Sequence, residues 1–474
     1  MANPDLLKFP SPFIASTKKK SIPVYFLDKK SFDKWLKKQP KLTKTQLDQN
    51  DFDASAGQTC TIKNDKAETV AILCGIASPL FYLDSASAAQ FIAQTFAKKF
   101  ISSHVFEIQS DHDEDDLAKL CIGWGLTAYK FDAYTKNDAS TPTLKWPTGA
   151  DKKFANSTIE SISLIRNLIN TPANDLGTDE LAEAAQNIAK QNKSKIKIIK
   201  GKQIETGFPM IYTVGKASPR PPQLVDMTWG KKSHPKVTIV GKGIIYDTGG
   251  LNLKPGMYMR DMKKDMGGSA HALGLAHLIM SMNLPINLRV LLPIAENAVA
   301  GNAYRPGDVL NSRKGITVEI GDTDAEGRLV VADALTYACE DKPDLLIDFC
   351  TLTGAARVAL GYDIPAFMTN QDAFLEELMT DSVKNDDPIW PLPLWSGYKK
   401  ELNSTVADMT NDGSGRAGAI HGGLFLEAFV DPAIDWIHLD CFAWEQHGKA
   451  GRPKGGSDTG MRAMYDFIKN RYSK

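Results

Sequence analysis

The second half of the chain alternates between short apolar runs and longer segments in which apolar residues recur at helical spacing. The apolar runs, which are typical of buried strands, lie at 237–240, 288–292, 316–320 and 345–349. The segments with helical periodicity lie at 265–282, 329–339 and 354–360. Strands that alternate with helices predict an α/β fold with a mostly parallel central sheet covered by helices. In such sheets, ligands bind beyond the carboxyl ends of the strands.

The first 150 residues have a mixed α/β pattern. An apolar run at 70–73 predicts a strand, and 86–96 has the spacing of a helix. The segment 130–153 is rich in polar and turn-forming residues, and a new helical pattern begins near Asn156. We therefore expect a smaller N-terminal α/β domain over 1–150 and a larger C-terminal α/β domain over 155–474.

The charge balance argues against polyanionic partners. Lys plus Arg and Asp plus Glu both number 56, so the formal net charge is zero. Such a chain has no overall field that attracts nucleic acid or anionic lipid, and we expect neither as a partner. Lysines are frequent in the first 45 residues. We interpret them as a solvated surface, with a local basic patch as the alternative.

Cysteine usage and hydropathy indicate a cytoplasmic protein. The six cysteines include no C-x-x-C pair, which is typical of reduced intracellular thiols. The N-terminus lacks the apolar core and small-residue cleavage site of a signal peptide. The best apolar run, 69–83, is interrupted by Gly75 and Pro79. It is shorter than the ~20 residues that a bilayer requires, so we expect no membrane segment.

Four acidic residues stand near strand-to-helix connections in the second half: Asp247, Asp265, Asp324 and Glu326. Carboxylates that converge in a dry cleft repel one another unless cations neutralise them. Two divalent ions would balance four carboxylates, and paired ions are a recurring device for hydrolysis. The neighbouring glycines favour tight turns and close approach. The alternative is that each acid caps a helix or lies at the surface.

Other hydrolytic and nucleotide-binding motifs are missing from the sequence. There is no H-E-x-x-H zinc helix and no G-x-S-x-G nucleophile elbow. The 241–243 segment lacks the third glycine of a dinucleotide loop and is not a Walker A sequence. Cys441 lies near His438 and Asp440 without a cysteine-peptidase signature, so we interpret it as a buried thiol.

The segment 323–329, Thr-Asp-Ala-Glu-Gly-Arg-Leu, resembles the signature of the leucyl (cytosol) aminopeptidase family of dimetal peptidases. Further blocks that resemble this family, in the same order and spacing, are 170–174, 240–243, 247–250, 253–255, 265–268, 390–394, 407–408 and 436–440. The resemblance covers roughly residues 160–470. Several blocks in register are far more specific than a single short motif.

The resemblance implies roles for particular residues. The metal ligands would be Lys242, Asp247, Asp265, Asp324 and Glu326. Lys242 would have to bind as a neutral amine; the alternative is an ion pair with one of the acids. Lys254 would polarise the scissile carbonyl, and Arg328 would hold bicarbonate as a general base. The side-chain pocket would be lined by Met262, Thr351 and Gly354.

The same resemblance implies an activity. The chain would release N-terminal amino acids, preferably leucine-like, from short peptides with a free N-terminus, by two-metal hydrolysis with a bridging water. Zinc or manganese would be the metal, and the assembly would be a homohexamer. The alternative is a DNA-binding or non-catalytic ligand-binding member of the family. The zero net charge disfavours DNA binding, and the complete set of catalytic positions disfavours a non-catalytic protein.

Two positions depart from the family pattern. Asp322 stands where the family usually has Asn, and it adds a charge beside the expected metal ligands. His421 lies in a stretch that usually consists of small residues. We interpret His421 as a packed helix residue, with a role in the substrate pocket as the alternative.

Overall fold

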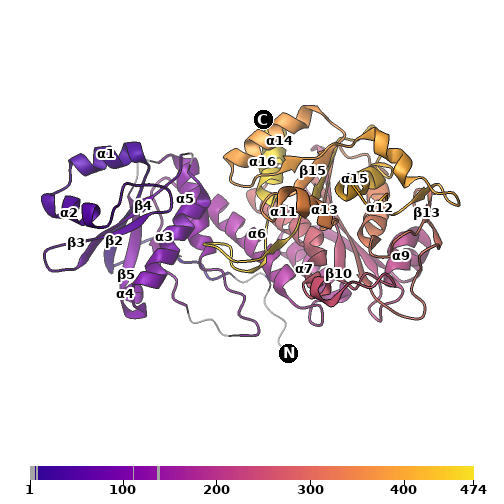
Figure 1. The fold of residues 1–474 in the computed structure, drawn as a ribbon, viewed down its shortest axis with the longest axis horizontal. Helices are drawn as coiled ribbons and strands as arrows, with labels where there is room; N and C mark the ends of the chain where they lie inside the picture. The colour runs from indigo at the N-terminus through magenta and orange to yellow at the C-terminus, as the bar shows by residue number, and fades with distance from the viewer. Residues whose placement is uncertain (1–5, 7–8, 79, 110–111, 136–138, 474) are drawn as a thin grey trace. The chain divides into compact units, whose positions relative to one another are not determined.

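The computed structural model describes residues 6, 9–78, 80–109, 112–135 and 139–473 (Figure 1). The chain forms two compact units, a smaller one of residues 7–163 and 447–454 and a larger one that includes 164–446 and 455–474. The division therefore falls inside helix α6 (Lys152–Asn170). The domain borders expected at 150 and 155 stay a prediction.

The smaller unit is built on a six-stranded sheet in the order β1-β6-β5-β2-β4-β3, parallel except where β3 joins β4. The strands are β1 (Phe13–Ile14), β2 (Lys20–Leu27), β3 (Thr59–Lys63), β4 (Thr69–Gly75), β5 (His104–Gln109) and β6 (Leu144–Lys145). The helices are α1 (Lys29–Lys37), α2 (Lys41–Gln49), α3 (Tyr82–Thr95), α4 (Lys98–Ser103) and α5 (Glu114–Leu126). The strand predicted at 70–73 lies in β4, and the helix predicted at 86–96 overlaps α3.

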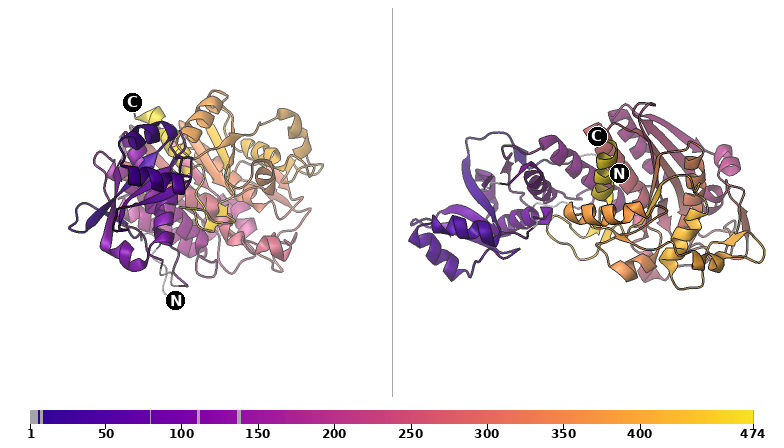
Figure 2. Two further views of the ribbon diagram at one scale, coloured as in Figure 1. Left: turned by 60° about the vertical axis from the view of Figure 1, so that its left-hand side comes forward. Right: turned by 90° about the horizontal axis from the view of Figure 1, so that it is seen from above.

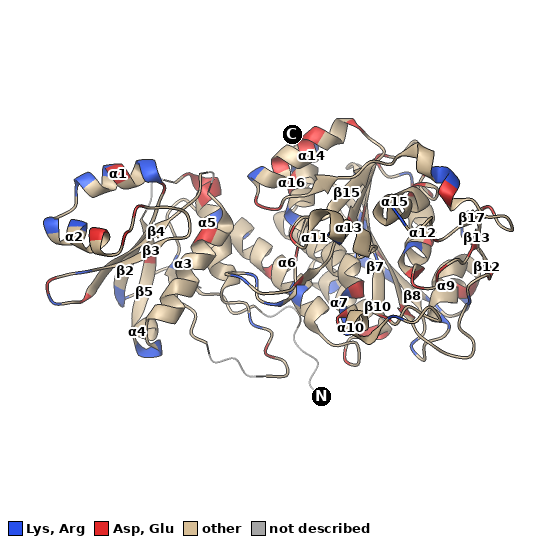
Figure 3. Cartoon of the chain, viewed as in Figure 1, with Lys and Arg blue, Asp and Glu red and all other residues tan. Residues whose placement is uncertain are grey.

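The N-terminal lysines are mixed with acidic residues. Figure 3 shows Lys and Arg alternating with Asp and Glu along α1 and α2. Lys20 lies 3.9 Å from Glu68 and Lys29 lies 3.6 Å from Asp53, and all four side chains are exposed. Exposed pairs of this kind contribute little to stability. This arrangement is that of a solvated surface.

The larger unit contains a nine-stranded sheet in the order β16-β15-β18-β14-β9-β11-β8-β7, with β10 also paired to β11. Its strands are β7 (Lys195–Lys200), β8 (Gln223–Trp229), β9 (Lys236–Gly241), β10 (Gly243–Asp247), β11 (Asn287–Asn297), β14 (Leu345–Cys350), β15 (Ala366–Thr369), β16 (Trp390–Pro391) and β18 (Trp436–Asp440). Strands β9, β10, β11, β14 and β18 run parallel to their neighbours in this group. The predicted mostly parallel sheet is confirmed, with antiparallel strands toward both edges.

One predicted strand lies outside the central sheet. The run 316–320 contains β13 (Thr317–Glu319), which pairs with β12 (Val309–Asn311) and β17 (Met409–Thr410) in a separate three-stranded sheet. The strand predicted at 316–320 is therefore present, but it does not belong to the central sheet. An apolar run identifies a strand but not its partners, and here a short antiparallel connection to β12 takes β13 away from the main sheet. A two-stranded sheet joins β19 (Trp444–Glu445) to β20 (Gly455–Gly456).

Helices cover both faces of the central sheet, as Figure 2 shows from two further directions. Helix α11 (Gly267–Met282) packs on β9 and β14 and against α16 (Met461–Tyr472). Helix α12 (Glu326–Cys339) packs on β9 and β11 and against α9 (Pro209–Gly215) and α15 (Gly418–Glu427). The remaining helical elements are α7 (Thr178–Gln191), α8 (Lys202–Gly207), α10 (Gly256–Met259), η1 (Met262–Met266), α13 (Gly354–Leu360), α14 (Ala373–Lys384) and η2 (Ser396–Leu402).

Helix α11 begins later than predicted and is buried on more of its surface than an amphipathic helix. The predicted segment 265–282 divides into the end of the 3-10 turn η1 and α11 itself, which is buried along almost its whole length. Gly268 permits this depth, because a Cβ at that position would overlap the carbonyl oxygen of Phe349 on β14. Among the described helices, none is long and apolar enough to cross a membrane.

A buried histidine in α11 should make the stability of the fold depend on pH. Burial lowers the pKa of His277 to about 4. Below its ordinary pKa the unfolded chain binds a proton that the folded chain excludes, so stability should fall as pH falls from about 6.5 toward 4. The pKa difference corresponds to a loss of about 2 kcal/mol between about pH 8 and pH 5.

The variant His277→Leu should lack this part of the pH dependence. The measurement is chemical unfolding of wild type and variant at both pH values. Equal pH dependence in the two proteins would contradict the prediction. The prediction would also be contradicted if acidification stabilised the wild-type protein more than the variant.

Candidate active site

Four acids from three segments meet at the carboxyl ends of the parallel strands. Asp247 ends β10, Asp265 lies in η1, Asp324 precedes α12 and Glu326 is the first residue of α12. Oxygen atoms of Asp247, Asp265 and Glu326 lie within 4.8 Å of one another, and all three residues are buried. The structure thus brings together the acids that the sequence placed near strand-to-helix connections.

Two lysines lie among these acids. The Nζ atom of Lys242 is 2.7 Å from Asp265 and 3.1 Å from Glu326, and it donates a hydrogen bond to the carbonyl oxygen of Thr351. The Nζ atom of Lys254 is 2.8 Å from Asp247 and also contacts Asp324. Lys242 therefore forms the ion pair that was the alternative to a neutral ligand.

Close packing holds Lys242 in place. The residue follows β9, and its backbone N–H donates to the carbonyl oxygen of Phe349 on β14. Gly327, at the start of α12, leaves room for the end of the lysine side chain, because a Cβ there would overlap Nζ. Glycine is thus needed at position 327, between Glu326 and Arg328, for the Lys242 side chain to reach both Asp265 and Glu326.

The electrostatics of the cluster indicate an excess of negative charge. Four carboxylates and two ammonium groups leave a formal charge of −2 in a buried site. Burial and the neighbouring Asp247 raise the pKa of Asp324 to about 7 and hold that of Glu326 well above its ordinary range. Burial opposes the charge of Lys242 and Lys254, but the surrounding carboxylates outweigh it and raise both pKa values.

The cluster has oxygen atoms available for a cation. Oε2 of Glu326 is buried and accepts no hydrogen bond. Oδ2 of Asp265 and Oδ1 of Asp324 are buried as well, and each contacts a lysine ammonium. Buried carboxylate oxygens without donors are costly unless charge is supplied. A set of several oxygens and one amine suits divalent ions such as Mn²⁺ or Zn²⁺.

Arg328 lies beside the cluster and is buried. Its Nη1 donates to the carbonyl oxygen of Asn411 at 2.6 Å, whereas its Nε has no acceptor. The side chain of Asn411 in turn binds the backbone of Gly321 and Asp322. A guanidinium edge without an acceptor is suited to a planar anion.

The two departures from the family pattern have local explanations. Oδ1 of Asp322 accepts the N–H of Asp324 at 2.8 Å and so closes the turn before α12, as an Asn side chain would also do. His421 is buried in α15, with Nε2 3.1 Å from Glu401 and its ring against Tyr398. These contacts are those of a packed helix residue.

The residues proposed as pocket walls lie around η1 and the loop after β14. Thr351 donates to Oδ1 of Asp265 at 2.7 Å, and Gly354 is exposed at the start of α13. Met262 is half-buried at the start of η1. Of the three, only Thr351 is joined directly to the acids.

Sequence reasoning missed Asp440, which holds the loop that carries Thr351. Asp440 ends β18 and accepts the N–H groups of Leu352 and Thr353 at 2.8 and 3.1 Å and the hydroxyl of Thr353 at 2.6 Å. It is buried, so these bonds fix the loop firmly. The signal was present: like Asp247, it is an acid at the end of an apolar strand.

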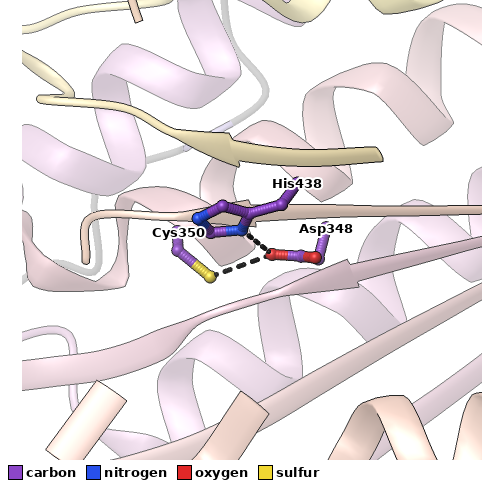
Figure 4. A group of neighbouring side chains, drawn as sticks. All are labelled: Asp348, Cys350 and His438. Carbon is purple, nitrogen blue, oxygen red and sulfur yellow. Dashed lines mark hydrogen bonds and ion pairs between the residues drawn. The ribbon is translucent and has the colours of Figure 1, made fainter. Parts of the chain in front are cut away.

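A second buried group of potential ligands lies deeper in the sheet. Figure 4 shows Asp348, Cys350 and His438 together, on β14 and β18. Asp348 accepts hydrogen bonds from His438 at 2.6 Å, from Cys350 at 3.2 Å and from the indole of Trp436 at 2.8 Å. Three donors satisfy this carboxylate, and burial raises the pKa of the Cys350 thiol, so the group is a hydrogen-bonded core network.

The cysteine near this network has no catalytic partner. Cys441 is buried and its thiol contacts the carbonyl oxygen of Thr459, while the Nδ1 atom of His438 binds Asp348. Burial also raises the pKa of Cys441 well above the ordinary thiol value. The interpretation of Cys441 as a buried thiol agrees with this environment.

Comparison with known families identifies the chain. Residues 163–465 match the model of the cytosol aminopeptidase family, catalytic domain, and residues 22–147 match that of the M17 aminopeptidase N-terminal domain. The chain belongs to the cytosol aminopeptidase family. As a member of that family it is an aminopeptidase, an enzyme that removes residues from the N-termini of peptides.

Individual relatives agree with this assignment. A probable cytosol aminopeptidase of Syntrophotalea carbinolica is 39% identical over 65% of this chain and 63% of its own length. One from Chlamydia abortus is 38% identical over 76% of each chain.

Solved structures extend the similarity to nearly the whole chain. The cytosol aminopeptidase of Coxiella burnetii superposes with a TM-score of 0.89 at 41% identity, covering 97% of this chain and 99% of that one. The bottromycin maturation enzyme BotP in complex with Mn superposes with a TM-score of 0.84 at 26% identity, over 95% and 99% of the two chains. The two-unit fold is thus that of the cytosol aminopeptidases.

Proposed function

We propose that the chain hydrolyses short peptides from a free N-terminus with two divalent metal ions held by Lys242, Asp247, Asp265, Asp324 and Glu326. The observation that carries this proposal is the buried cluster of carboxylates with a formal charge of −2, in which Oε2 of Glu326 accepts no hydrogen bond. When bound, the ions would activate a water molecule and polarise the scissile carbonyl. Manganese or zinc fits the donor set, and the BotP structure contains Mn.

Lys254 would act on the scissile carbonyl. Its ammonium lies at the edge of the acid cluster, and its side chain is 14% exposed, more than that of Lys242 at 3%. A donor at this edge reaches both the cluster and a bound peptide. It would stabilise the negative charge that develops on the carbonyl oxygen.

Arg328 would hold bicarbonate near the reacting groups. The Nε atom without an acceptor and the burial of the side chain support this role, because a planar anion accepts from a guanidinium edge. Bicarbonate held there would have the chemistry of a general base. Arg328 itself keeps its proton, although burial lowers its pKa.

We propose, from family resemblance, a pocket formed by Met262, Thr351 and Gly354 that accepts leucine-like side chains. The same resemblance supports a homohexamer. The names of the relatives support a cytoplasmic location, and the zero net charge gives no reason to expect a nucleic-acid partner.

The direct test is release of p-nitroaniline from leucine p-nitroanilide. Chelator-treated protein should be inactive and should recover with Mn²⁺ or Zn²⁺, because the ions supply the activated water. The N-acetylated substrate is the matched control and should not be cleaved. Cleavage without metal, or of the acetylated substrate, would refute a metal-dependent exopeptidase.

A further inference from the structure

Lys264 is a buried lysine that the proposed chemistry does not use. It lies in η1 between Lys263 and the acid Asp265, and only 5% of the residue is exposed. Its Nζ atom rests 4.9 Å from the centre of the Phe442 ring. Throughout the described part of the chain, no residue forms a hydrogen bond or ion pair with this Nζ. An ammonium that belongs to a largely buried residue and has no protein acceptor is costly, and a cation–π contact offsets only part of that cost.

The Phe442 ring, which the Lys264 ammonium contacts, lies near residues of the proposed side-chain pocket. The guanidinium of Arg357 lies 5.0 Å from the centre of the same Phe442 ring. Arg357 also lies 3.9 Å from where a Cβ would stand on Gly354. Ala443, the next residue, and Thr351 both border Gly267. Phe442 thus lies beside Arg357, which borders Gly354, and precedes Ala443, which borders the same glycine as Thr351.

We infer that Lys264 makes the pocket selective for N-terminal residues with acidic side chains and against those with basic ones. A glutamate carboxylate would supply the acceptor that the ammonium lacks, through a charge-assisted hydrogen bond. A lysine or arginine side chain would meet like charge from Lys264 and Arg357. A leucine side chain would pack on Phe442 but leave the ammonium unpaired. This inference rests on the proposed aminopeptidase function and adds acidic residues to the leucine-like substrates proposed above.

The test compares glutamyl, leucyl and lysyl p-nitroanilides with the metal-loaded enzyme. We expect kcat/KM for the glutamyl substrate to exceed that for the lysyl substrate by about 30-fold or more. The variant Lys264→Met should lower this ratio at least about tenfold, whereas Lys264→Arg should keep glutamate ahead. The matched control Lys232→Met changes an exposed lysine outside the pocket and should leave the ratio unchanged.

The outcomes separate the two proposals. Cleavage of the leucyl substrate with equal rates for glutamyl and lysyl substrates would overturn the inference and leave the aminopeptidase function standing. Cleavage of none of the three would refute the function itself. A wild-type preference for glutamate that Lys264→Met does not change would also overturn the role of Lys264. If Lys264→Met does not fold, Arg357→Met provides the second variant, which should lower the same ratio.

Discussion

Replacing Glu326 by Gln is expected to lower kcat/KM for leucine p-nitroanilide by about 10³-fold, because the ions that activate the reaction contribute several kcal/mol. Glu326 is buried at the first position of α12, and its Oε2 accepts no hydrogen bond. Glutamine keeps the shape of the side chain but removes the charge that would bind an ion. The metal content of the purified variant should fall together with its activity.

Glu326→Gln should also affect stability, and this effect should be favourable although the effect on activity is unfavourable. The cluster carries a formal charge of −2 without metal, so Glu326→Gln relieves repulsion among the remaining acids. The metal-free variant should therefore be at least as stable to chemical unfolding as metal-free wild type. Lower stability together with full metal content would show that Glu326 is a structural partner of Lys242 and not a ligand.

The matched control for this experiment is Glu340→Gln. Glu340 follows the other end of the same helix, about 20 Å away, and pairs with Arg313 near the surface. Its activity and metal content should stay close to those of wild type. Loss of activity in the control would mean that the helix, and not the acid cluster, responds to the substitution.

Replacing Lys254 by Met is expected to lower kcat by about 10²–10³-fold, the usual effect of removing a donor that stabilises an oxyanion. Lys254 lies 2.8 Å from Asp247 and contacts Asp324, so the substitution also removes a positive charge from beside two proposed metal ligands. Metal affinity should therefore be equal or higher, in contrast with Glu326→Gln.

The measurement for Lys254 is kcat at saturating metal, with metal affinity determined separately by calorimetry. Lys232→Met again serves as the control, because Lys232 is an exposed lysine after β8. A Lys254→Met enzyme with wild-type kcat at saturating metal would exclude a role in transition-state stabilisation. Weaker metal binding would instead indicate that Lys254 organises the cluster.

Local patterns in the sequence determined the class of fold and the place of the acids. The alternation of apolar runs and helical segments predicts a mostly parallel sheet, because side-chain periodicity is set by neighbours along the chain. Asp247 and Glu326 could be placed near strand-to-helix connections for the same reason. The sequence blocks around 323–329 indicated the family, which hydrophobic periodicity cannot do. The family resemblance in turn gave the expected roles of Lys254 and Arg328.

Only the tertiary structure decided which distant residues touch. Strand order places Asp440 against the loop at 352–353, 87 or 88 residues away in sequence, and sets Lys264 on the ring of Phe442. The tertiary arrangement also places β13 outside the central sheet and His438 within hydrogen-bond distance of Asp348. These contacts depend on how strands and helices are arranged in space. A short sequence window carries no information about that arrangement, because each contact joins segments far apart along the chain.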